Sequence, residues 1–157
     1  MQTQTSNSSS DTWDGTQYNK NSSVQYDAAI ALLHTQVFQD DEQILDVGCG
    51  DGKITRQIAA LVPKGGVIGV DASLNMLKIA EQEAATCTNL EFQLKDVQQL
   101  EFNQQFNWVT SFFCLQWVPN KLAAFQGIYR GLQSGGRLLA IMPMLSDLSD
   151  APQKLIT

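Results

Sequence analysis

Short apolar segments alternate with longer segments of helical spacing along most of this chain. The apolar segments are typical of buried β-strands, and they comprise residues 43–48, 67–72, 90–96, 106–113 and 137–143. Apolar residues recur at helical spacing in the segments between or before them, which comprise residues 24–36, 53–62, 73–85 and 119–132. Strands that alternate with helices predict an α/β fold with a parallel sheet, right-handed crossovers and helices on both faces.

The predicted sheet also indicates where a ligand would bind. In open parallel sheets, ligands bind beyond the carboxyl ends of the strands, where the strand order reverses. The residues that follow the predicted strands are therefore the candidates for a site, namely 46–52, 71–73, 96–97 and 112–117.

A glycine-rich turn, LDVGCGDG at residues 45–52, follows the first predicted strand. Gly48 and Gly50 allow positive φ angles and let a ligand approach the backbone closely. The free N–H groups at the start of the next helix attract negative charge. The sixth position from Gly48 is Lys53, so the GxGxxG or GxGxxA fingerprint of dinucleotide-binding proteins is not met. A plain tight turn is the alternative interpretation.

Two aspartates end neighbouring predicted strands. Asp71 closes the second strand in VIGVDAS, about twenty residues after the glycine turn, where a carboxylate can accept both ribose hydroxyls of a nucleotide-type ligand. Asp96 closes the third strand in LKDV, where a carboxylate can accept from an exocyclic amine such as that of adenine. Each residue has a simpler interpretation as a turn or helix-cap residue.

Length and charge limit the remaining possibilities. The 157 residues suffice for one domain, predicted over residues 13–157, after a polar tail at residues 1–12 that is predicted to be disordered. A net charge of −6 argues against binding to nucleic acid or to a membrane through a basic patch. No segment has the length of apolar residues that a membrane span requires.

The cysteines indicate a reducing environment. There are three of them, an odd number, and none lies in CxxC spacing or near His34, which is the single histidine. We therefore expect neither a disulfide framework nor a metal site, and we predict a cytoplasmic protein.

Five sequence segments together resemble the class I S-adenosylmethionine-dependent methyltransferases. These segments are ILDVGCGDG, VIGVDAS, LKDV, FNWVTSFFCLQWV and LQSGGRLLAIMP, and the likeness covers about residues 18–145. The resemblance implies a Rossmann-like, doubly wound and mostly parallel sheet with strand order 3-2-1-4-5. It also implies S-adenosylmethionine as the cofactor, S-adenosylhomocysteine as the product and a small-molecule methyl acceptor.

The same resemblance assigns a cofactor role to individual residues. It places Gly48, Cys49 and Gly50 under the amino-acid moiety of the cofactor, with Asp46 near its amino group. The remaining positions would hold the nucleoside and the sulfur: Asp71 at the ribose, Ala72 and Met76 on the adenine, Asp96 and Val97 at the adenine edge, and Phe113 and Cys114 beside the methyl-donating sulfur.

A narrower likeness concerns the methyl acceptor. The stretch YNKNSSVQ at residues 18–25 and the stretch FFCLQWV at residues 112–118 are similar to the carboxyl methyltransferases of the juvenile hormone acid and trans-aconitate type. In the juvenile hormone acid group, the matching Gln and Trp orient the substrate carboxylate, and here they are Gln25 and Trp117. Tyr18 would lie over the cofactor. Gln116 stands where that group usually has His, which leaves the identity of the substrate open.

Carboxyl methylation suits neutral side chains of this kind. Methyl transfer from a sulfonium is an in-line displacement, and a carboxylate is already ionised at neutral pH, so no general base is required. Catalysis then depends mostly on proximity and alignment. An amide and an indole N–H can hold the carboxylate without a buried countercharge.

The chain departs from the family after the fifth predicted strand. Members usually have seven strands, whereas SDLSDAPQKLIT, the last segment of this chain, carries no strand signal. We therefore expect a C-terminally truncated domain that binds the cofactor but turns over poorly. Its fifth strand would have an unpaired edge, through which homo-oligomers could form.

Three alternatives stay open. The acceptor could be a quinone, a thioester on a carrier or an amine, because acceptors vary on this fold. The chain could also be a non-catalytic cofactor-binding module. An NAD-dependent oxidoreductase is the third alternative, and Lys53 at the sixth fingerprint position weakens it.

Overall fold

The computed structural model describes the backbone of residues 15–143 and the side chains of residues 22–143. Within this range, five strands form one parallel sheet in the order β3-β2-β1-β4-β5, which confirms the predicted fold class. The strands are β1 (Gln43–Val47), β2 (Gly66–Asp71), β3 (Leu90–Leu94), β4 (Phe106–Phe112) and β5 (Leu132–Ile141). The strand order reverses between β1 and β4, so the sheet has its topological switch point there.

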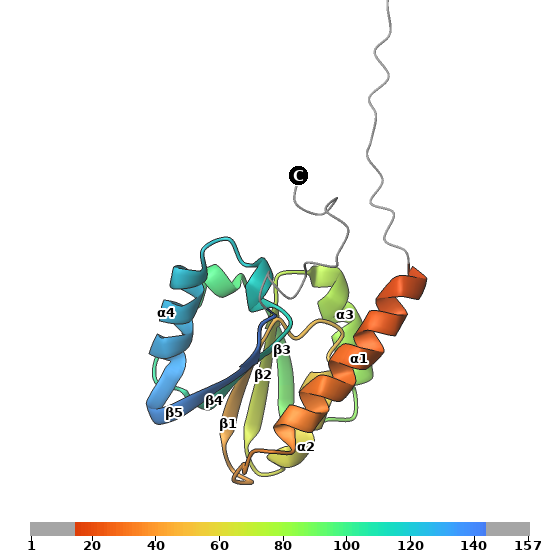
Figure 1. Ribbon diagram of the computed structural model, residues 1–157. Helices are drawn as coiled ribbons and strands as arrows, with labels where there is room; N and C mark the ends of the chain where they lie inside the picture. The colour runs from red at the N-terminus through yellow and green to blue at the C-terminus, as the bar shows by residue number, and fades with distance from the viewer. Residues whose placement is uncertain (1–14, 144–157) are drawn as a thin grey trace, which may run out of the picture.

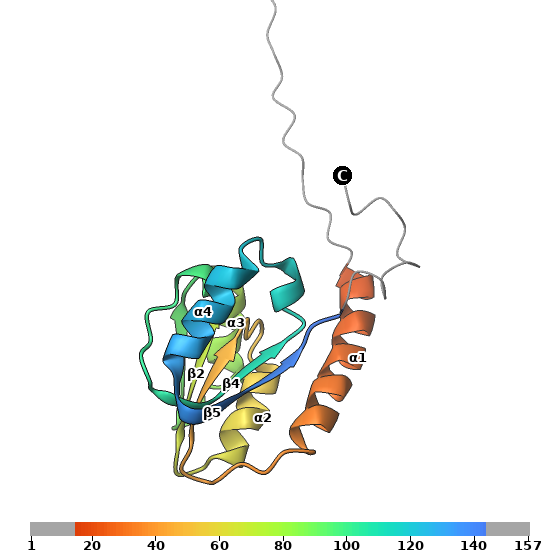
Figure 2. The same ribbon diagram turned by 60° about the vertical axis from the view of Figure 1, so that its left-hand side comes forward.

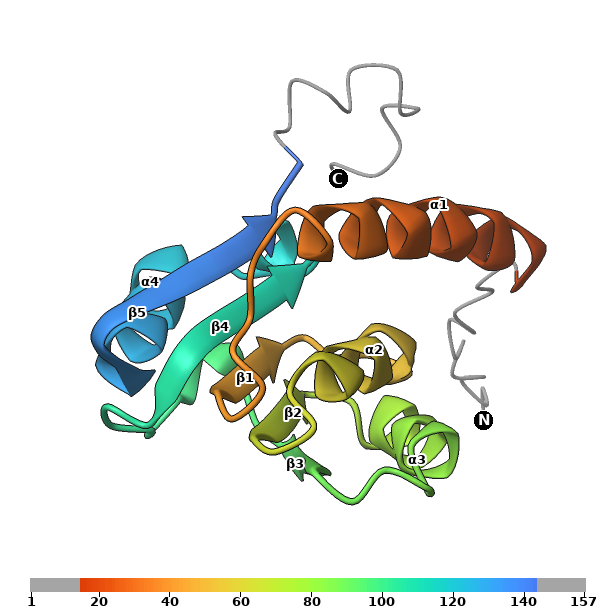
Figure 3. The ribbon, with the colours of Figure 1, turned by 90° about the horizontal axis from the view of Figure 1, so that it is seen from below.

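Helices cover both faces of the sheet (Figures 1, 2 and 3). Three of them, α1 (Gly15–Leu33), α2 (Lys53–Leu61) and α3 (Leu74–Glu83), lie on one face, and α4 (Lys121–Gly131) lies on the other. Two short 3-10 segments, η1 (Val97–Gln99) and η2 (Leu115–Trp117), follow β3 and β4. None of the helices described in residues 15–143 has both the length and the apolar character needed to cross a membrane.

The alternation of side chains along β1 divides the interior into two apolar cores. Leu45 and Val47 pack in a core with Ile128 of α4, whereas Ile44 packs in a second core with Leu33 of α1. All five of these side chains are at most 2% exposed. A strand that is buried on both faces has apolar residues at nearly every position instead of at every second one. This pattern is why residues 43–48 could be predicted as a strand.

Two helix boundaries differ from the predictions. α1 begins at Gly15 rather than near Val24. α4 begins at Lys121, and Pro119 precedes the helix instead of occupying its first turn. The reason is that Asn120 is the N-cap, with its side-chain oxygen accepting from the amide of Ala123 at 3.1 Å.

A turn was also predicted at Ser134-Gly135-Gly136, and this prediction is wrong because these residues lie within β5. β5 already pairs with β4 at Leu132, and a register shift opposite Phe106 and Trp108 absorbs the intervening residues. Gly135 has a φ of +79°, a conformation that glycine adopts at little cost. The two glycines therefore form an irregularity within a strand. The predicted tail at residues 1–12 and the last segment, SDLSDAPQKLIT, lie outside the described residues, so the domain limits remain predictions.

Candidate functional site

A cavity of about 420 Å³ lies at the carboxyl ends of the strands, where the topology predicts a ligand site. Of the residues that the sequence singled out, eight line it: Gly48, Asp71, Ala72, Asp96, Val97, Phe113, Cys114 and Trp117. The wall also includes residues that the sequence did not single out, namely Val70, Lys95, Gln98, Val118 and Pro119. The sequence signal that marks them is their position within or next to the segments that follow β2, β3 and β4.

The glycine loop is held to β2 by backbone hydrogen bonds. The amides of Gly48 and Cys49 both donate to the carbonyl oxygen of Val70, at 2.8 and 3.0 Å. Gly48 has a φ of +71°, and a Cβ added there would collide with the Sγ and Cβ atoms of Cys114. Gly48 thus allows the chain to turn and lets the loop after β4 approach the glycine loop.

The space above Gly50 is suited to a ligand. A Cβ added at Gly50 would meet only the terminal methyl of Met76 within 4 Å, at 3.6 Å. Gly50 has a φ of +54°, a conformation that glycine adopts at little cost, and the residue is half-buried. Bare backbone next to open space is a cradle that a flat or extended ligand can occupy.

Asp71 is fixed in position at the end of β2. Its Oδ2 accepts from the amide of Gly50 at 3.0 Å, and its Oδ1 accepts from the amide of Ser73 at 2.9 Å. An ionised carboxylate has about four acceptor positions, so each oxygen retains capacity for a further donor. Because Asp71 also lines the cavity, it can accept a pair of hydroxyl groups without moving.

The start of α3 places the residues that follow Asp71. Ser73 is the predicted N-cap, and its side chain accepts from the amide of Met76 at 3.3 Å. This cap orients Ala72, which is exposed and lines the cavity, and Met76, which is half-buried beside Gly50. Ala72 thus lies in the cavity wall, whereas Gly50 and Met76 are not among the residues that line it.

Asp96 has a local structural role as well as a place in the wall. Its Oδ1 accepts from the amide of Gln98 at 2.8 Å and from the Nε2 of the same residue at 3.1 Å. Asp96 therefore caps η1, which was the simpler of its two interpretations. The side chain is exposed and lines the cavity beside Val97, so the second interpretation remains compatible with its position.

Asp46 lies in the interior, outside the cavity wall. It is 2% exposed, and its two oxygens accept from the hydroxyls of Thr55 and Thr110, each at 2.7 Å. Burial raises the pKa of this carboxyl from 3.8 to about 6, although both hydroxyl hydrogen bonds lower it. The charge of Asp71 contributes a further increase in the pKa. Asp46 therefore couples β1 to α2 and β4 directly beneath the loop that leaves β1.

The two cysteines near the loop are protonated at neutral pH. Cys49 is buried, does not line the cavity, and has a thiol pKa that burial raises. Cys114 lines the cavity, and burial raises its pKa to about 11. Neither is activated as a nucleophile. The described part of the chain contains no group of three or more His, Cys, Asp or Glu residues arranged to hold a metal ion.

The two residues predicted to orient the acceptor are placed differently. Trp117 lines the cavity and remains 66% exposed. Gln25 is an exposed residue of α1 and is not part of the wall. Tyr18 lies in the first turn of α1, where only the backbone is described. The structure therefore brings Trp117, but not the Gln25 side chain, to the cavity.

The fold and the cavity define a Rossmann-like α/β domain with a nucleotide-type binding site at the switch point of its sheet. Comparison with known proteins then identifies the family. Residues 44–136 match the family model described as a methyltransferase domain. The chain belongs to this methyltransferase family, and its resemblance to the class I S-adenosylmethionine-dependent enzymes is confirmed.

Individual relatives agree with this assignment. A protein of Invertebrate iridescent virus 6 that is assigned as a methyltransferase, 235L, is 36% identical over 85% of this chain and 49% of its own length. The trans-aconitate 2-methyltransferase of Deinococcus radiodurans is 34% identical over 73% of this chain and 42% of its own length. This chain thus spans less than half the length of these two relatives.

A solved structure supports the cofactor. The phosphoethanolamine N-methyltransferase 2 of Haemonchus contortus, solved with S-adenosyl-L-methionine, superposes with a TM-score of 0.67 and 30% identity. The superposition covers 73% of this chain and 27% of that protein. S-adenosylmethionine is thereby confirmed as the cofactor of the family. The open cradle at Gly50 and the fixed carboxylate of Asp71 fit such a molecule.

Proposed function

We propose that this chain binds S-adenosylmethionine in the cavity at the carboxyl ends of its strands and belongs to an enzyme that methylates a small molecule. The observation that carries the proposal is the Asp71 carboxylate, which two backbone amides hold at the wall with acceptor capacity to spare. It lies next to the side-chain-free cradle at Gly50. A ribose diol and the amino-acid end of the cofactor match these two features.

Each half of the cofactor has its own set of residues in this proposal. Asp71 accepts the ribose hydroxyls, Ala72 and Met76 pack on the adenine, and Asp96 with Val97 lies at the adenine edge. The backbone from Gly48 through Cys49 to Gly50 passes under the amino-acid moiety, with Asp46 beneath it, and Phe113 and Cys114 flank the sulfur. The cofactor supplies a sulfonium methyl group that an acceptor takes by in-line displacement.

The wall favours an acceptor that needs no deprotonation. Cys114 is protonated at neutral pH, and both aspartates of the wall already accept backbone hydrogen bonds. His34, the single histidine, is exposed on the chain segment that follows α1. A carboxylate is ionised without help, so alignment alone suffices for its methylation. We therefore propose carboxylate O-methylation, with Trp117 donating its indole N–H to the acceptor and Gln25 assisting from α1.

Other acceptors are the alternative. The names of the relatives include demethylmenaquinone, malonyl-[acyl-carrier protein] and trans-aconitate methyltransferases, so acceptors differ among proteins that this chain matches. This chain spans less than half the length of these relatives, so we propose cofactor binding for this part and methylation of a small molecule for the whole enzyme.

Calorimetry and a labelled-methyl transfer assay test the proposal in two steps. We expect the chain to bind S-adenosylmethionine and S-adenosylhomocysteine with measurable heat, and Asp71→Ala to weaken the binding about 100-fold. Folded protein that shows no heat with either ligand would contradict cofactor binding. Transfer is then measured with trans-aconitate, a hydroquinone and an ethanolamine phosphate as acceptors. Methylation of an amine or hydroquinone in preference to the carboxylate would contradict the proposed acceptor class. Binding without transfer to any of the three acceptors would support cofactor binding alone for this part of the protein.

A further inference from the structure

The side chain of Gln98 hydrogen-bonds to two segments beside the cavity. Its Nε2 donates to Oδ1 and Oδ2 of Asp96, at 3.1 and 3.3 Å, and its Oε1 accepts from the backbone amide of Asn120 at 3.0 Å. Asp96 precedes η1, whereas Asn120 follows residues 117–119, which also line the cavity. The side-chain amide of Gln98 therefore joins the wall after β3 to the wall after β4.

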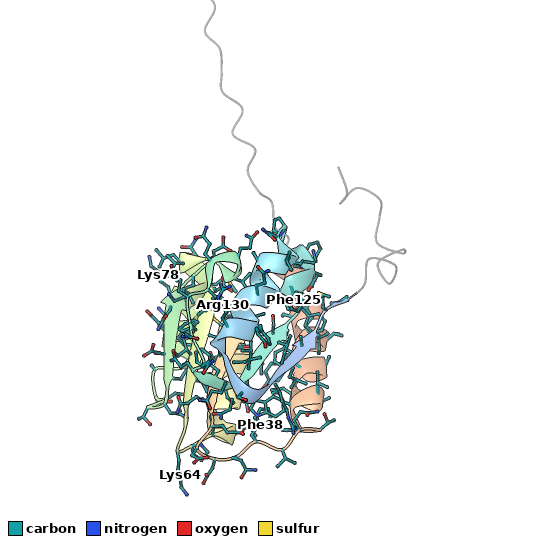
Figure 4. All side chains as sticks on the ribbon, turned by 90° about the vertical axis from the view of Figure 1, so that its left-hand side faces the viewer. Phe38, Lys64, Lys78, Phe125 and Arg130 are labelled. Carbon is teal, nitrogen blue, oxygen red and sulfur yellow. The ribbon has the colours of Figure 1, made fainter. Side chains whose placement is uncertain are left out.

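The segment that carries Gln98 is attached to α4 at a second point. Arg130, which Figure 4 labels on α4, donates from Nη2 to the carbonyl oxygen of Leu100 at 3.3 Å. Leu100 directly follows η1 and is buried, and a Cβ added at Gly127 of α4 would lie only 3.0 Å from its Cβ. Packing against α4 therefore places the backbone of η1, and the Gln98 side chain only has to span the distance to the start of the same helix.

The hydrogen bonds from Gln98 use the two oxygens of Asp96 unequally. A carboxylate oxygen has about two acceptor positions. Oδ1 accepts from both the backbone amide and the Nε2 of Gln98, whereas Oδ2, among the described residues, accepts from Nε2 alone. The Asp96 side chain is exposed and lines the cavity, so Oδ2 can accept one further donor from a ligand. A purine with an exocyclic amine supplies such a donor, and a purine with a carbonyl oxygen at that position does not.

We propose that Gln98 is a positioning residue that holds the Asp96 carboxylate in the orientation that accepts from the adenine amine of the cofactor. An exposed carboxylate without this bridge rotates freely, and fixing it when the ligand binds costs free energy. Because Gln98 also binds the amide of Asn120, the carboxylate is held by a group that is itself anchored to α4. This inference rests on the proposed function, since it requires the cofactor to occupy the cavity, and it adds the residue that sets the preference for an aminopurine.

Calorimetry with two ligands tests the role of Gln98. The ligands are S-adenosylhomocysteine and S-inosylhomocysteine, which has a carbonyl oxygen in place of the exocyclic amine. We expect the wild-type chain to prefer S-adenosylhomocysteine at least about tenfold. Gln98→Met keeps the length of the side chain but removes its amide. This variant should bind S-adenosylhomocysteine about tenfold more weakly, as the loss of one hydrogen bond to a charged group does, and S-inosylhomocysteine within about twofold of the wild type.

The matched control is Gln99→Met, the same substitution one residue further along η1, at an exposed side chain outside the cavity wall. It should change neither affinity by more than about twofold. In an Asp96→Ala background, Gln98→Met should have no further effect, because Gln98 acts through that carboxylate.

Gln98→Glu separates the two ends of the bridge. The new carboxylate can still accept from the amide of Asn120, but it cannot donate to Asp96. Hydrogen exchange of the Asn120 amide, followed by NMR without ligand, should therefore be faster in Gln98→Met and stay slow in Gln98→Glu. The affinity for S-adenosylhomocysteine should fall at least about tenfold in both variants. Circular dichroism checks that each variant is folded.

The outcomes separate this inference from the proposed function. Equal losses for the two ligands in Gln98→Met would leave Gln98 with a structural role only and overturn the inference. A wild-type chain that binds both ligands equally, or Asn120 exchange that Gln98→Met does not change, would overturn it as well. A folded wild-type chain that binds neither ligand would contradict the proposed function itself, and the inference would fall with it.

Discussion

The two sides of the cavity are built in different ways. On the β2 side, backbone amides of Gly48 and Gly50 are bonded to β2 and to Asp71, so the wall is rigid before any ligand binds. On the β4 side, Trp117 is 66% exposed, and Gln25 is not part of the wall. The proposed cofactor half is thus preorganised by the described residues, whereas the proposed acceptor half is open. Cofactor affinity and methyl transfer should therefore respond to different substitutions.

The largest expected effect concerns the glycine loop that defines the rigid side. Gly48→Ala forces a side chain into a positive φ and against Cys114, and we expect a loss of about 3–5 kcal/mol in the free energy of unfolding. Gly135→Ala is the matched control, because Gly135 also has a positive φ but has no atom within 4 Å of an added Cβ. The Gly135→Ala variant should lose only about 1–2 kcal/mol in its free energy of unfolding. Urea unfolding measures both, and equal losses would show that contact with Cys114 is unimportant.

The second effect concerns the carboxylate on the rigid side. Asp71→Ala removes the acceptor of two backbone amides and of the proposed ribose contact, so the affinity for S-adenosylhomocysteine should fall about 100-fold, or about 2.7 kcal/mol. Asp51→Ala, in the same loop but outside the cavity wall, is the control and should change the affinity less than about threefold. Calorimetry measures both, and similar losses in the two variants would place the cofactor elsewhere.

A third prediction concerns the interior beneath the loop. The pKa of Asp46 is raised to about 6 in the folded protein, so its contribution to stability is present at low pH and is lost as the pH rises through that value. Relative to Asp46→Asn, the wild-type chain should lose about 2 kcal/mol in the free energy of unfolding between about pH 4.5 and about pH 7. Parallel urea titrations of both proteins at each pH measure the difference. A difference that does not vary with pH would mean that the Asp46 carboxyl keeps its ordinary pKa.

The smallest effect on binding is expected on the open side. Trp117→Phe removes the indole N–H but retains an aromatic ring in the wall. Cofactor affinity should stay within about twofold, whereas methyl transfer to a carboxylate acceptor should fall about tenfold, the contribution of one hydrogen bond. Separate kcat and KM values, with calorimetry for the cofactor, distinguish the two. A parallel loss of cofactor affinity would contradict the division of the cavity into two halves.

Much of the fold was predictable because its signals are local. Apolar runs that end at glycine or aspartate indicated the strands, and the cap at Ser73 was confirmed where the sequence placed it. One error occurred where a distant partner decided the outcome. Ser134-Gly135-Gly136 has the composition of a turn, but pairing with β4 draws it into β5. Propensity is a weak guide when tertiary pairing competes with it.

The candidate site, like the fold, was predictable only in part. Asp71 and Gly48 follow buried strands, and the parallel sheet brings the ends of those strands to one edge. Asp46 belongs to the same sequence motif but lies beneath the surface, where Thr110 is 64 residues away in sequence. No local signal predicts such a partner, because Thr110 is one residue within the strand predicted at residues 106–113.

By itself, the sequence determined the parallel α/β class, the glycine turn and the strand-end aspartate, because residue spacing and backbone freedom act over short distances. The tertiary structure alone decided that Asp46 of the glycine turn is buried with a raised pKa, whereas Asp71 at the end of β2 lines the cavity. Burial, solvation and charge complementarity depend on which distant segments pack together, and spacing along the chain does not encode them.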